Sequence, residues 1–574
     1  MRRKILIVSY LILALSILEG CSDDDSAKDS YSNNVANNAY NNTANGGNVN
    51  VGGVQDIGVF REIIESGGIP APSTFSDNGF FSEHYIEYPF SDCGENICLN
   101  GMMGRGNSVI SNDYMNVIQI VLKSYLDPAD FSRPPTDFIL VIDVSGSMAG
   151  DKITKVREGL HLMVDSLNSD DRISLIAFSD FIQEKLDLTY ADSLENKESM
   201  HLAVSNLVPG GSTNIYGGLS AGFAKAQIGV EQERHVRVVL LSDGVPTSGE
   251  VDPNVIQSFA ESRATDNVQL TSIGVGSDIN YDLMKNLALE GGNFYYIENY
   301  SALSDIFVTE LDYFAFPIAK DITISVVSST GIKIGDSVGF GDAWIPEGNG
   351  GSAQFPNLYL ASRTSNDIED PYSRRGGGSA LFLRVTPTGE TVDLSKAYVK
   401  LRYLDPDMDD YVDQLFTLSD LGMDGSIPVD EYYSEYEMKK SFAMLNAYLA
   451  FYETVVLAEN WMMEESFDLI TGAIDWMYTV NIVLDDDDIS ADIVLMEQLS
   501  NNIYPYTYSG DDYYCNNGDC YYPETDYEND REEVHYGCSQ GNGNSSHFIS
   551  IMLLTLSFAL YFRRKYSFKK VKDL

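Results

Sequence analysis

The sequence predicts an α/β protein with a doubly wound, mostly parallel sheet, accompanied by an antiparallel β-sandwich and a helical C-terminal region. The first observation is an apolar run rich in β-branched residues at 138–142, which is typical of a buried strand. The second is an alternation of strand-like and helix-like segments that continues to residue 275. The third is a change after residue 316 to runs of alternating polar and apolar residues between glycine-rich turns. The alternation favours a parallel sheet covered by helices on both faces, and the later pattern favours antiparallel strands.

Hydrophobic periodicity gives the elements of the first part. Apolar residues at 153, 156, 160, 164 and 167 recur at helical spacing. The other expected elements are strands at 172–178, 235–241 and 268–275, helices at 215–226 and 254–264, and a shorter edge strand within 181–188.

Five oxygen-bearing side chains lie where these strands end or where the next loops begin. They are Asp143, Ser145, Ser147, Thr213 and Asp243. Each alone has a structural explanation, because Asp-Gly after a strand is a common turn and a hydroxyl residue after glycines commonly caps a helix. Together they lie at the carboxyl ends of strands, where open α/β sheets place their ligands.

This combination resembles the metal-ion-dependent adhesion site of the von Willebrand factor A family, over residues 135–316. The resemblance implies a Rossmann-like domain in which Ser145, Ser147 and, in the ligand-ready state, Thr213 contact the ion directly. Asp143 and Asp243 would bind it directly or through water. An all-oxygen set suits Mg²⁺, or Mn²⁺, and excludes a thiolate or imidazole site. In the family, a carboxylate from a protein partner fills the open position on the ion.

Composition limits the other partners. The 574 residues suggest roughly four domains. With 37 basic against 85 acidic residues, the formal charge of −48 argues against nucleic acid as a partner. The sequence shows no phosphate-binding loop, no serine elbow of the hydrolase type and no recognisable pairing of a histidine with a nucleophile, so we expect no enzymatic activity.

The N-terminus carries an export signal. Three basic residues at 2–4 precede an apolar run at 5–18, which is the layout of a bacterial signal peptide. The following Leu-Glu-Gly-Cys resembles a lipobox, which implies acylation of Cys21 and attachment to a membrane. Glu19 departs from the small residue usual in that motif, so cleavage nearby by a different signal peptidase is the alternative. Either cleavage predicts an exported protein of the bacterial envelope or cell surface.

The C-terminus carries a second candidate anchor. An apolar run at 548–562 is followed by a basic cluster, and it spans only about 22 Å as a helix against about 30 Å of bilayer core. Together with Cys538, it resembles the sorting tails of myxobacterial-type surface proteins, which implies processing near Cys538 and removal of the hydrophobic part. The competing reading is a permanent stop-transfer helix.

The remaining cysteines form two close pairs. They are Cys93 with Cys98, and Cys515 with Cys520. Such pairs can bind metal, but His84 is the one histidine near Cys93 and the export signal favours oxidation. We therefore expect two local disulfides.

The regions around the A domain are expected to have different structures. A strand-like run at 117–122 precedes the domain and does not fit its alternation of strands and helices. We therefore expect this run to pair with strands after residue 316. The A domain would then be inserted into the sandwich. Residues 435–459 predict a helix with an apolar packing face. Acidic runs at 405–410 and 485–488 are expected to be a turn and solvated surface. Motifs at 60–65, 68–72 and 80–84 are similar to the leader region of bacterial secreted A-domain proteins.

The expected organisation has eight segments. They are a signal peptide (1–20), a disordered tether (21–56), an N-terminal region that adds a strand to the sandwich (57–132), the A domain (133–316), the sandwich (317–425), a helical region (426–505), a disordered linker (506–546) and the hydrophobic tail (547–574). The sequence favours an envelope-anchored protein that binds a protein partner through a divalent cation. A structural or assembly factor of the envelope, with the A domain as a scaffold, is the alternative, and an uncharacterised hydrolase is a weaker one.

Overall fold

The computed structural model describes most of the chain between residues 47 and 521. The described residues are 47–507, without 90–92, 112, 127–132, 265–267, 289–290, 298–301, 303–304, 311–312, 314–315, 366–373, 390–393, 407, 422–426 and 428–429, together with 514–516 and 519–521. The chain forms two compact units, 1–508 and 509–574. In the second unit, β19 (Tyr514–Asn516) and β20 (Asp519–Tyr521) form an antiparallel pair.

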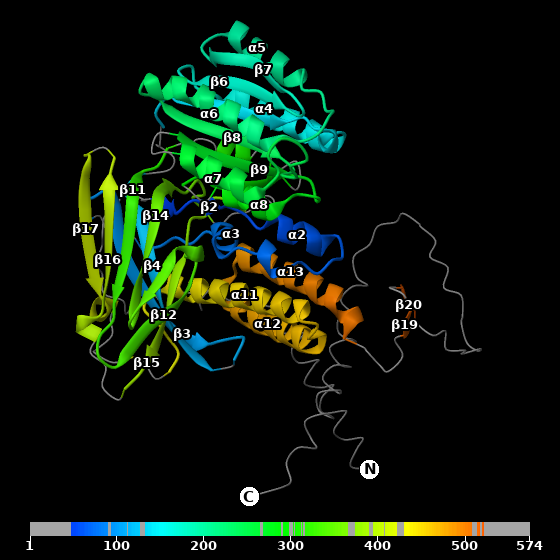
Figure 1. Ribbon diagram of the computed structural model, residues 1–574. Helices are drawn as coiled ribbons and strands as arrows, with labels where there is room; N and C mark the ends of the chain where they lie inside the picture. The colour runs from blue at the N-terminus through cyan, green and yellow to red at the C-terminus, as the bar shows by residue number, and fades with distance from the viewer. Residues whose placement is uncertain are drawn as a thin grey trace, which may run out of the picture. The chain divides into compact units, whose positions relative to one another are not determined.

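A seven-stranded sheet is the centre of the A domain (Figure 1). Its parallel strands are β5 (Thr136–Asp143), β6 (Arg172–Phe178), β8 (His235–Ser242), β9 (Val268–Val275) and β10 (Asn293–Ile297). β7 (Ile182–Tyr190) closes one edge in antiparallel orientation and is largely exposed, as expected of an edge strand. The observed order is β2-β10-β9-β8-β5-β6-β7.

Helices cover both faces of this sheet. They are α4 (Asp151–Ser166), α5 (Leu194–Ser205), α6 (Ile215–Glu231), α7 (Pro253–Arg263) and α8 (Tyr281–Leu287). Alternate residues of β5 enter two different cores, because successive side chains of a strand point to opposite faces. Leu140 packs in the core that contains Leu160 of α4, whereas Val141 packs in the core that contains Leu219 of α6. The doubly wound α/β fold is confirmed.

The second edge of this sheet comes from the N-terminal segment. β2 (Gly53–Val54) pairs in parallel with β10, and the Gln55 amide donates to the carbonyl of Phe294 at 3.0 Å. A few residues earlier, β1 (Gly47–Asn50) pairs with two strands of the antiparallel sheet. The prediction of a disordered tether at 21–56 is therefore wrong for residues 47–56. The composition there is polar, but main-chain hydrogen bonds to two sheets order it, and these depend little on side-chain hydrophobicity.

The antiparallel part is an eleven-stranded sheet. Its main path is β12 (Ile332–Val338), β15 (Leu381–Pro387), β4 (Tyr114–Ser124), β1, β14 (Gly350–Leu360), β11 (Ala319–Val327), β16 (Tyr398–Asp405) and β17 (Asp410–Thr417), with β3 (Ile97–Asn107), β13 (Trp344–Glu347) and β18 (Tyr432–Tyr433) off this path. Ile120 of β4 and Ile324 of β11 lie in one apolar core, so the two halves of the sheet pack as a sandwich.

The A domain is inserted into this sandwich. Leu381 of β15 pairs with Ile120 of β4, and the A-domain strands lie between β4 and β11 in the chain. The expected pairing of residues 117–122 with strands after residue 316 is confirmed.

Three long helices form the helical region. They are α11 (Tyr436–Glu459), α12 (Met463–Leu484) and α13 (Asp487–Ile503), and they pack with α2 (Gly58–Glu65) and α3 (Asp77–Ser82) (Figure 1). α11 is the one described helix long and apolar enough to cross a membrane. Two-thirds of its most apolar window, 67%, is buried inside the protein.

The acidic run at 485–488 is only partly solvated surface, since Asp485 and Asp487 are exposed as expected but Asp486 and Asp488 are buried. Asp488 is buried and accepts from Arg363 Nη1 at 2.9 Å and from Lys440 Nζ at 3.2 Å. A neighbouring pair joins Arg374 Nη2 to Asp492 at 2.8 Å. These cations come from segments far away in sequence, which is why the run alone could not reveal the burial of its charge.

Candidate metal centre

The first loop of the site follows β5. Asp143, the last residue of that strand, is fully buried, and its Oδ1 accepts from the backbone amide of Ser145 at 2.8 Å. Its Oδ2 accepts from the Ser242 hydroxyl at 2.5 Å. A short 3-10 turn (Gly146–Met148) then brings the hydroxyls of Ser145 and Ser147 within 3.0 Å of each other. These contacts fix the Asp143 carboxylate in the same loop as the hydroxyl oxygens of Ser145 and Ser147.

The second loop carries Thr213 and is tied to the first by main-chain hydrogen bonds. The Gly146 amide donates to the carbonyl of Gly211 at 2.9 Å, and the Gly210 amide donates to that of Val144 at 2.8 Å. Gly211 has a φ of 87°, and a Cβ there would lie 2.4 Å from Asp180 Oδ2, so this close approach requires glycine. Thr213 itself is buried to 3% exposure.

A third loop holds Thr213 from the other side. The Thr213 amide donates to the Thr247 hydroxyl at 2.8 Å, and the amides of Thr247 and Ser248 donate back to the carbonyl of Thr213. This loop follows Asp243, so the segments that carry the candidate ligands form one hydrogen-bonded assembly.

Asp243 is the most informative residue of the site. Its side chain is 1% exposed, and Oδ1 has no hydrogen-bond partner among the described residues. Its other oxygen, Oδ2, accepts from Lys152 Nζ at 3.2 Å. A buried carboxylate oxygen without a partner is costly, so this atom indicates a ligand that supplies positive charge.

The electrostatics of the site are also consistent with a cation. The pKa of Asp143 is raised to about 6, because burial and the nearby negative charge of Asp243 outweigh the hydrogen bonds from Ser242 and Ser145, which lower it. A divalent cation would favour the ionised form of both carboxylates. The ammonium of Lys152 is the positive charge that the protein itself places against Asp243, and it also donates to Asp278.

The donor set fits a hard divalent ion. Two carboxylates and three hydroxyls offer only oxygen, and oxygen ligands are those of Mg²⁺ and Mn²⁺. Among the described residues, no group of three or more His, Cys, Asp or Glu side chains is placed to hold a metal. The candidate centre therefore depends on hydroxyl oxygens as much as on carboxylates.

Comparison with known proteins identifies this part of the chain. The family model of the von Willebrand factor type A domain matches residues 137–309. These residues form a von Willebrand factor type A domain. Domains of this family commonly bind a metal ion at a metal-ion-dependent adhesion site.

Two curated relatives show how far the similarity extends. Inter-alpha-trypsin inhibitor heavy chain H2 of Mus musculus is 30% identical over 172 residues, which cover 29% of this chain and 18% of that protein. Heavy chain H4 of Homo sapiens is 30% identical over 173 residues, which cover 29% of this chain and 19% of that protein. The chain thus spans about a fifth of the length of these relatives, and the similarity is that of the A domain.

Solved structures give similar matches. A von Willebrand factor type A protein from Catenulispora acidiphila has a TM-score of 0.43 at 14% identity, over 67% of this chain and 86% of that one. The mussel byssus protein PTMP1, solved with a zinc-occupied site of this kind, has a TM-score of 0.25 at 22% identity, over 30% of this chain and 44% of that one.

The sequence missed three residues that shape the A-domain site. Ser242 and Thr247 hold Asp143 and Thr213, and Lys152 is paired with Asp243. Ser242 directly precedes Asp243 at the end of a strand, which is a usable signal. Nothing in the sequence pairs Lys152 with a residue 91 positions away.

The other predicted site residues have separate outcomes. The disulfide between Cys93 and Cys98 is confirmed. Cys515 and Cys520 lie opposite each other in the β19–β20 pair, and their disulfide stays a prediction. Cys21 and Cys538 lie outside the described residues.

Proposed function

We propose that the A domain binds a protein partner through a divalent cation, Mg²⁺ or Mn²⁺, held by Asp143, Ser145, Ser147, Thr213 and Asp243. The observation that carries the proposal is the unpartnered, buried Oδ1 of Asp243, whose negative charge lies near the carboxylate of Asp143. The ion would supply a positive charge and an open position on an otherwise acidic protein. A carboxylate of the partner is the group that suits such a position.

The proposal is for binding and not for catalysis. The hydroxyls and carboxylates of the site are held by hydrogen bonds within and between its loops, which suits a rigid site for an ion. The homologous part of the heavy chains is likewise this domain.

The direct test is titration of the full chain with Mg²⁺ and Mn²⁺ by calorimetry. We expect Asp243→Asn to weaken ion binding at least tenfold, because it removes one of two anionic ligands. Asp278→Asn is the matched control, since that carboxylate contacts Lys152 but is not among the five proposed ligands. Ion binding by Asp243→Asn equal to that of the native chain would overturn the proposed site.

Partner binding is tested with the same variants. Capture of envelope proteins should be lost with chelator and with Asp243→Asn, and Thr213→Ala should weaken it more than it weakens ion binding. Chelator-resistant capture would instead support the second candidate, a scaffold of the envelope. That candidate is favoured by the insertion of the A domain between two strands of a sandwich.

We also propose that the chain is exported and anchored at the bacterial envelope. The support is the signal-like run at 5–18, with Cys21 as the acylation site, and the apolar run at 548–562. Intact-mass analysis of the membrane fraction should show an acylated N-terminus at Cys21. A chain that begins with an unmodified Met1 would contradict export, and retention of residues 548–562 would favour the stop-transfer helix over processing near Cys538.

A further inference from the structure

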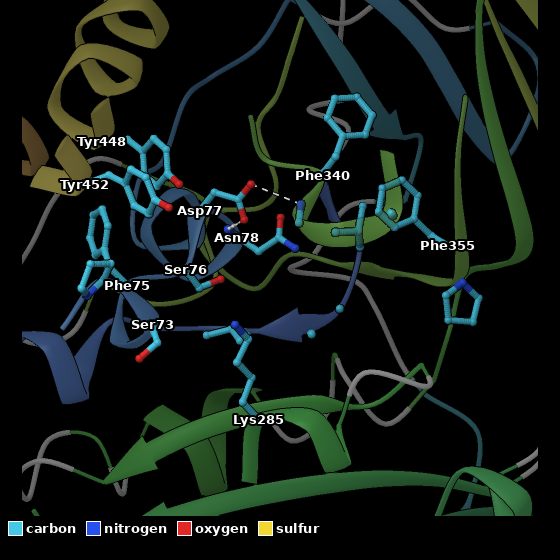
Figure 2. A pocket seen from close by; sticks show the side chains of 18 of the residues that line it. Ser73, Phe75, Ser76, Asp77, Asn78, Lys285, Phe340, Phe355, Tyr448 and Tyr452 are labelled. Carbon is cyan, nitrogen blue, oxygen red and sulfur yellow. Dashed lines mark hydrogen bonds between the residues drawn. The ribbon is translucent and has the colours of Figure 1, made fainter. Parts of the chain in front are cut away.

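A separate cavity lies outside the candidate metal centre. Its volume is about 470 Å³, within the usual range for sites of small organic ligands. The lining comes from the β2 segment, the turn before α3, α8 of the A domain, the sandwich and α11 (Figure 2). None of the five proposed metal ligands lines it.

Aromatic rings form two sides of this cavity. On one side, Tyr448 stacks on Phe75 at 5.3 Å with planes 14° apart, and on Tyr452 at 6.0 Å with planes 18° apart. On the other side, Phe340 and Phe355 stack at 6.2 Å. Figure 2 shows the two groups on opposite sides of Asp77 and Asn78. Tyr452 is 39% exposed, so its ring is accessible to a ligand.

Polar groups between the rings can form further hydrogen bonds. Asn78 lines the cavity, and its side-chain Nδ2 donates no hydrogen bond to another described residue, so it can donate to a ligand oxygen. Asp77 is held in place by the amides of Gly339 at 2.7 Å and Gly341 at 3.2 Å. A purely apolar ligand would leave Asn78 unsatisfied, so the cavity suits a ligand with hydroxyl groups.

Lys285 adds one positive charge to the lining. Its ammonium lies 5.8 Å from the Tyr281 ring centroid, and it forms no ion pair with another described residue. Most other buried or half-buried cations of the described chain have carboxylate partners, such as Lys225 with Glu184. In a chain of net charge −48, an ammonium in a cavity without a carboxylate partner favours an anionic ligand.

We propose that this cavity binds an anionic saccharide, such as a uronic acid. The apolar C–H face of a sugar ring would pack on the exposed Tyr452 ring, its hydroxyls would meet Asn78 and Asp77, and its carboxylate would lie towards Lys285. A phosphorylated ligand fits less well, because a doubly charged group would lie near the fixed carboxylate of Asp77. The volume suits one or two sugar rings.

The test uses the full chain with D-glucuronate, D-galacturonate and D-glucose, observed by saturation-transfer NMR in chelator. We expect transfer to the ring protons of at least one acid and binding at least fivefold weaker for glucose. Because chelator is present, a positive result is independent of the metal centre, and its failure leaves the cation proposal intact.

Two variants and a control assign the contacts. Tyr452→Ala should weaken binding of the acid at least tenfold, and Lys285→Met should abolish the preference for acid over glucose. Tyr436→Ala removes an exposed ring of 64% exposure from the same helix and should change nothing. Thermal unfolding of each variant checks the fold. The proposal is overturned if none of the three sugars binds, if glucose binds as well as both acids, or if folded Tyr452→Ala binds as the native chain does.

Discussion

Lys152 is expected to oppose cation binding in the A domain. Its Nζ lies 3.2 Å from Asp243 Oδ2, and its side chain is only 17% exposed. The ammonium therefore occupies one oxygen of a proposed metal ligand, and it would repel a divalent ion bound to the same carboxylate. Replacement by methionine, which keeps the length and removes the charge, should free Asp243 for the ion.

The size of the effect follows from Coulomb's law. An ammonium and a divalent ion about 4 Å apart repel each other by about 2 kcal/mol in water and about 8 kcal/mol at the effective dielectric of a protein surface. Reorganisation of Asp243 and of the exposed Asp278 cancels most of this repulsion, so we expect a net gain below the value in water. A gain of about 1.4 kcal/mol corresponds to tenfold tighter binding of Mg²⁺.

Calorimetry with Mg²⁺ measures this gain directly, and the shift of the unfolding temperature with Mg²⁺ measures it independently. Without the ion, Lys152→Met should be less stable than the native chain, because Asp243 loses its ammonium partner. Lys152→Arg keeps the charge, and Lys155→Met removes the same charge one turn further along α4, so both should bind Mg²⁺ about as the native chain does. Unchanged or weaker Mg²⁺ binding by Lys152→Met would refute the reasoning.

Three further predictions concern parts of the protein outside the metal centre. Burial raises the pKa of Glu310 from its ordinary value of 4.5 to about 7, so its contribution to stability is present below pH 4.5 and is lost as pH rises through 7. Glu310→Gln should therefore unfold at a higher temperature than the native chain at pH 8 and should lose this pH dependence. Asp488→Asn should lower the free energy of unfolding in urea by roughly 3–5 kcal/mol, because it leaves the guanidinium of Arg363 facing a neutral side chain at position 488, while Lys440 keeps its ion pair with Asp486; a loss below 1 kcal/mol would contradict the buried pairing. A chain that begins at residue 57 should unfold at a lower temperature than one that begins at 47, since it lacks β1 and β2; equal unfolding temperatures would show that these strands contribute no stability.

The sequence predicted the A domain well because its information is local. The strand at 172–178 has the same bounds in the structure, since a buried parallel strand is a continuous apolar run between turn residues. The candidate ligands were found because each follows a strand directly. Pairing between strands far apart in the chain was harder to predict. The insertion of the A domain was inferred from the strand-like run at 117–122, which did not fit the domain's own alternation of strands and helices. No local pattern could show that β2 extends the A-domain sheet.

The sequence also did not predict which charged side chains are buried. Residues 485–488 carry four consecutive carboxylates and would ordinarily be surface, yet Arg374 and Lys440 approach them from distant segments. Burial alone would raise the pKa of Glu83, but the positive charges of Arg61 and Arg374 outweigh it and lower that pKa to about 2. Whether an acidic run is exposed depends on which cations reach it, and that is a property of the fold and not of the run.

The N-terminal segment links the A domain to the rest of its unit. β1 lies between β4 and β14 of the sandwich, and β2 follows it after two residues on the edge of the A-domain sheet. Asp56, just beyond, accepts from the Tyr296 amide at 3.0 Å and from Arg375 Nε at 3.1 Å, so one carboxylate joins the last strand of the A domain to a loop of the sandwich region. Main-chain pairing on both sides resists shear because several hydrogen bonds must break together. A force on a partner held at the metal centre would therefore reach the sandwich through the residues around 47–56 as well as through the two connections that flank the inserted domain.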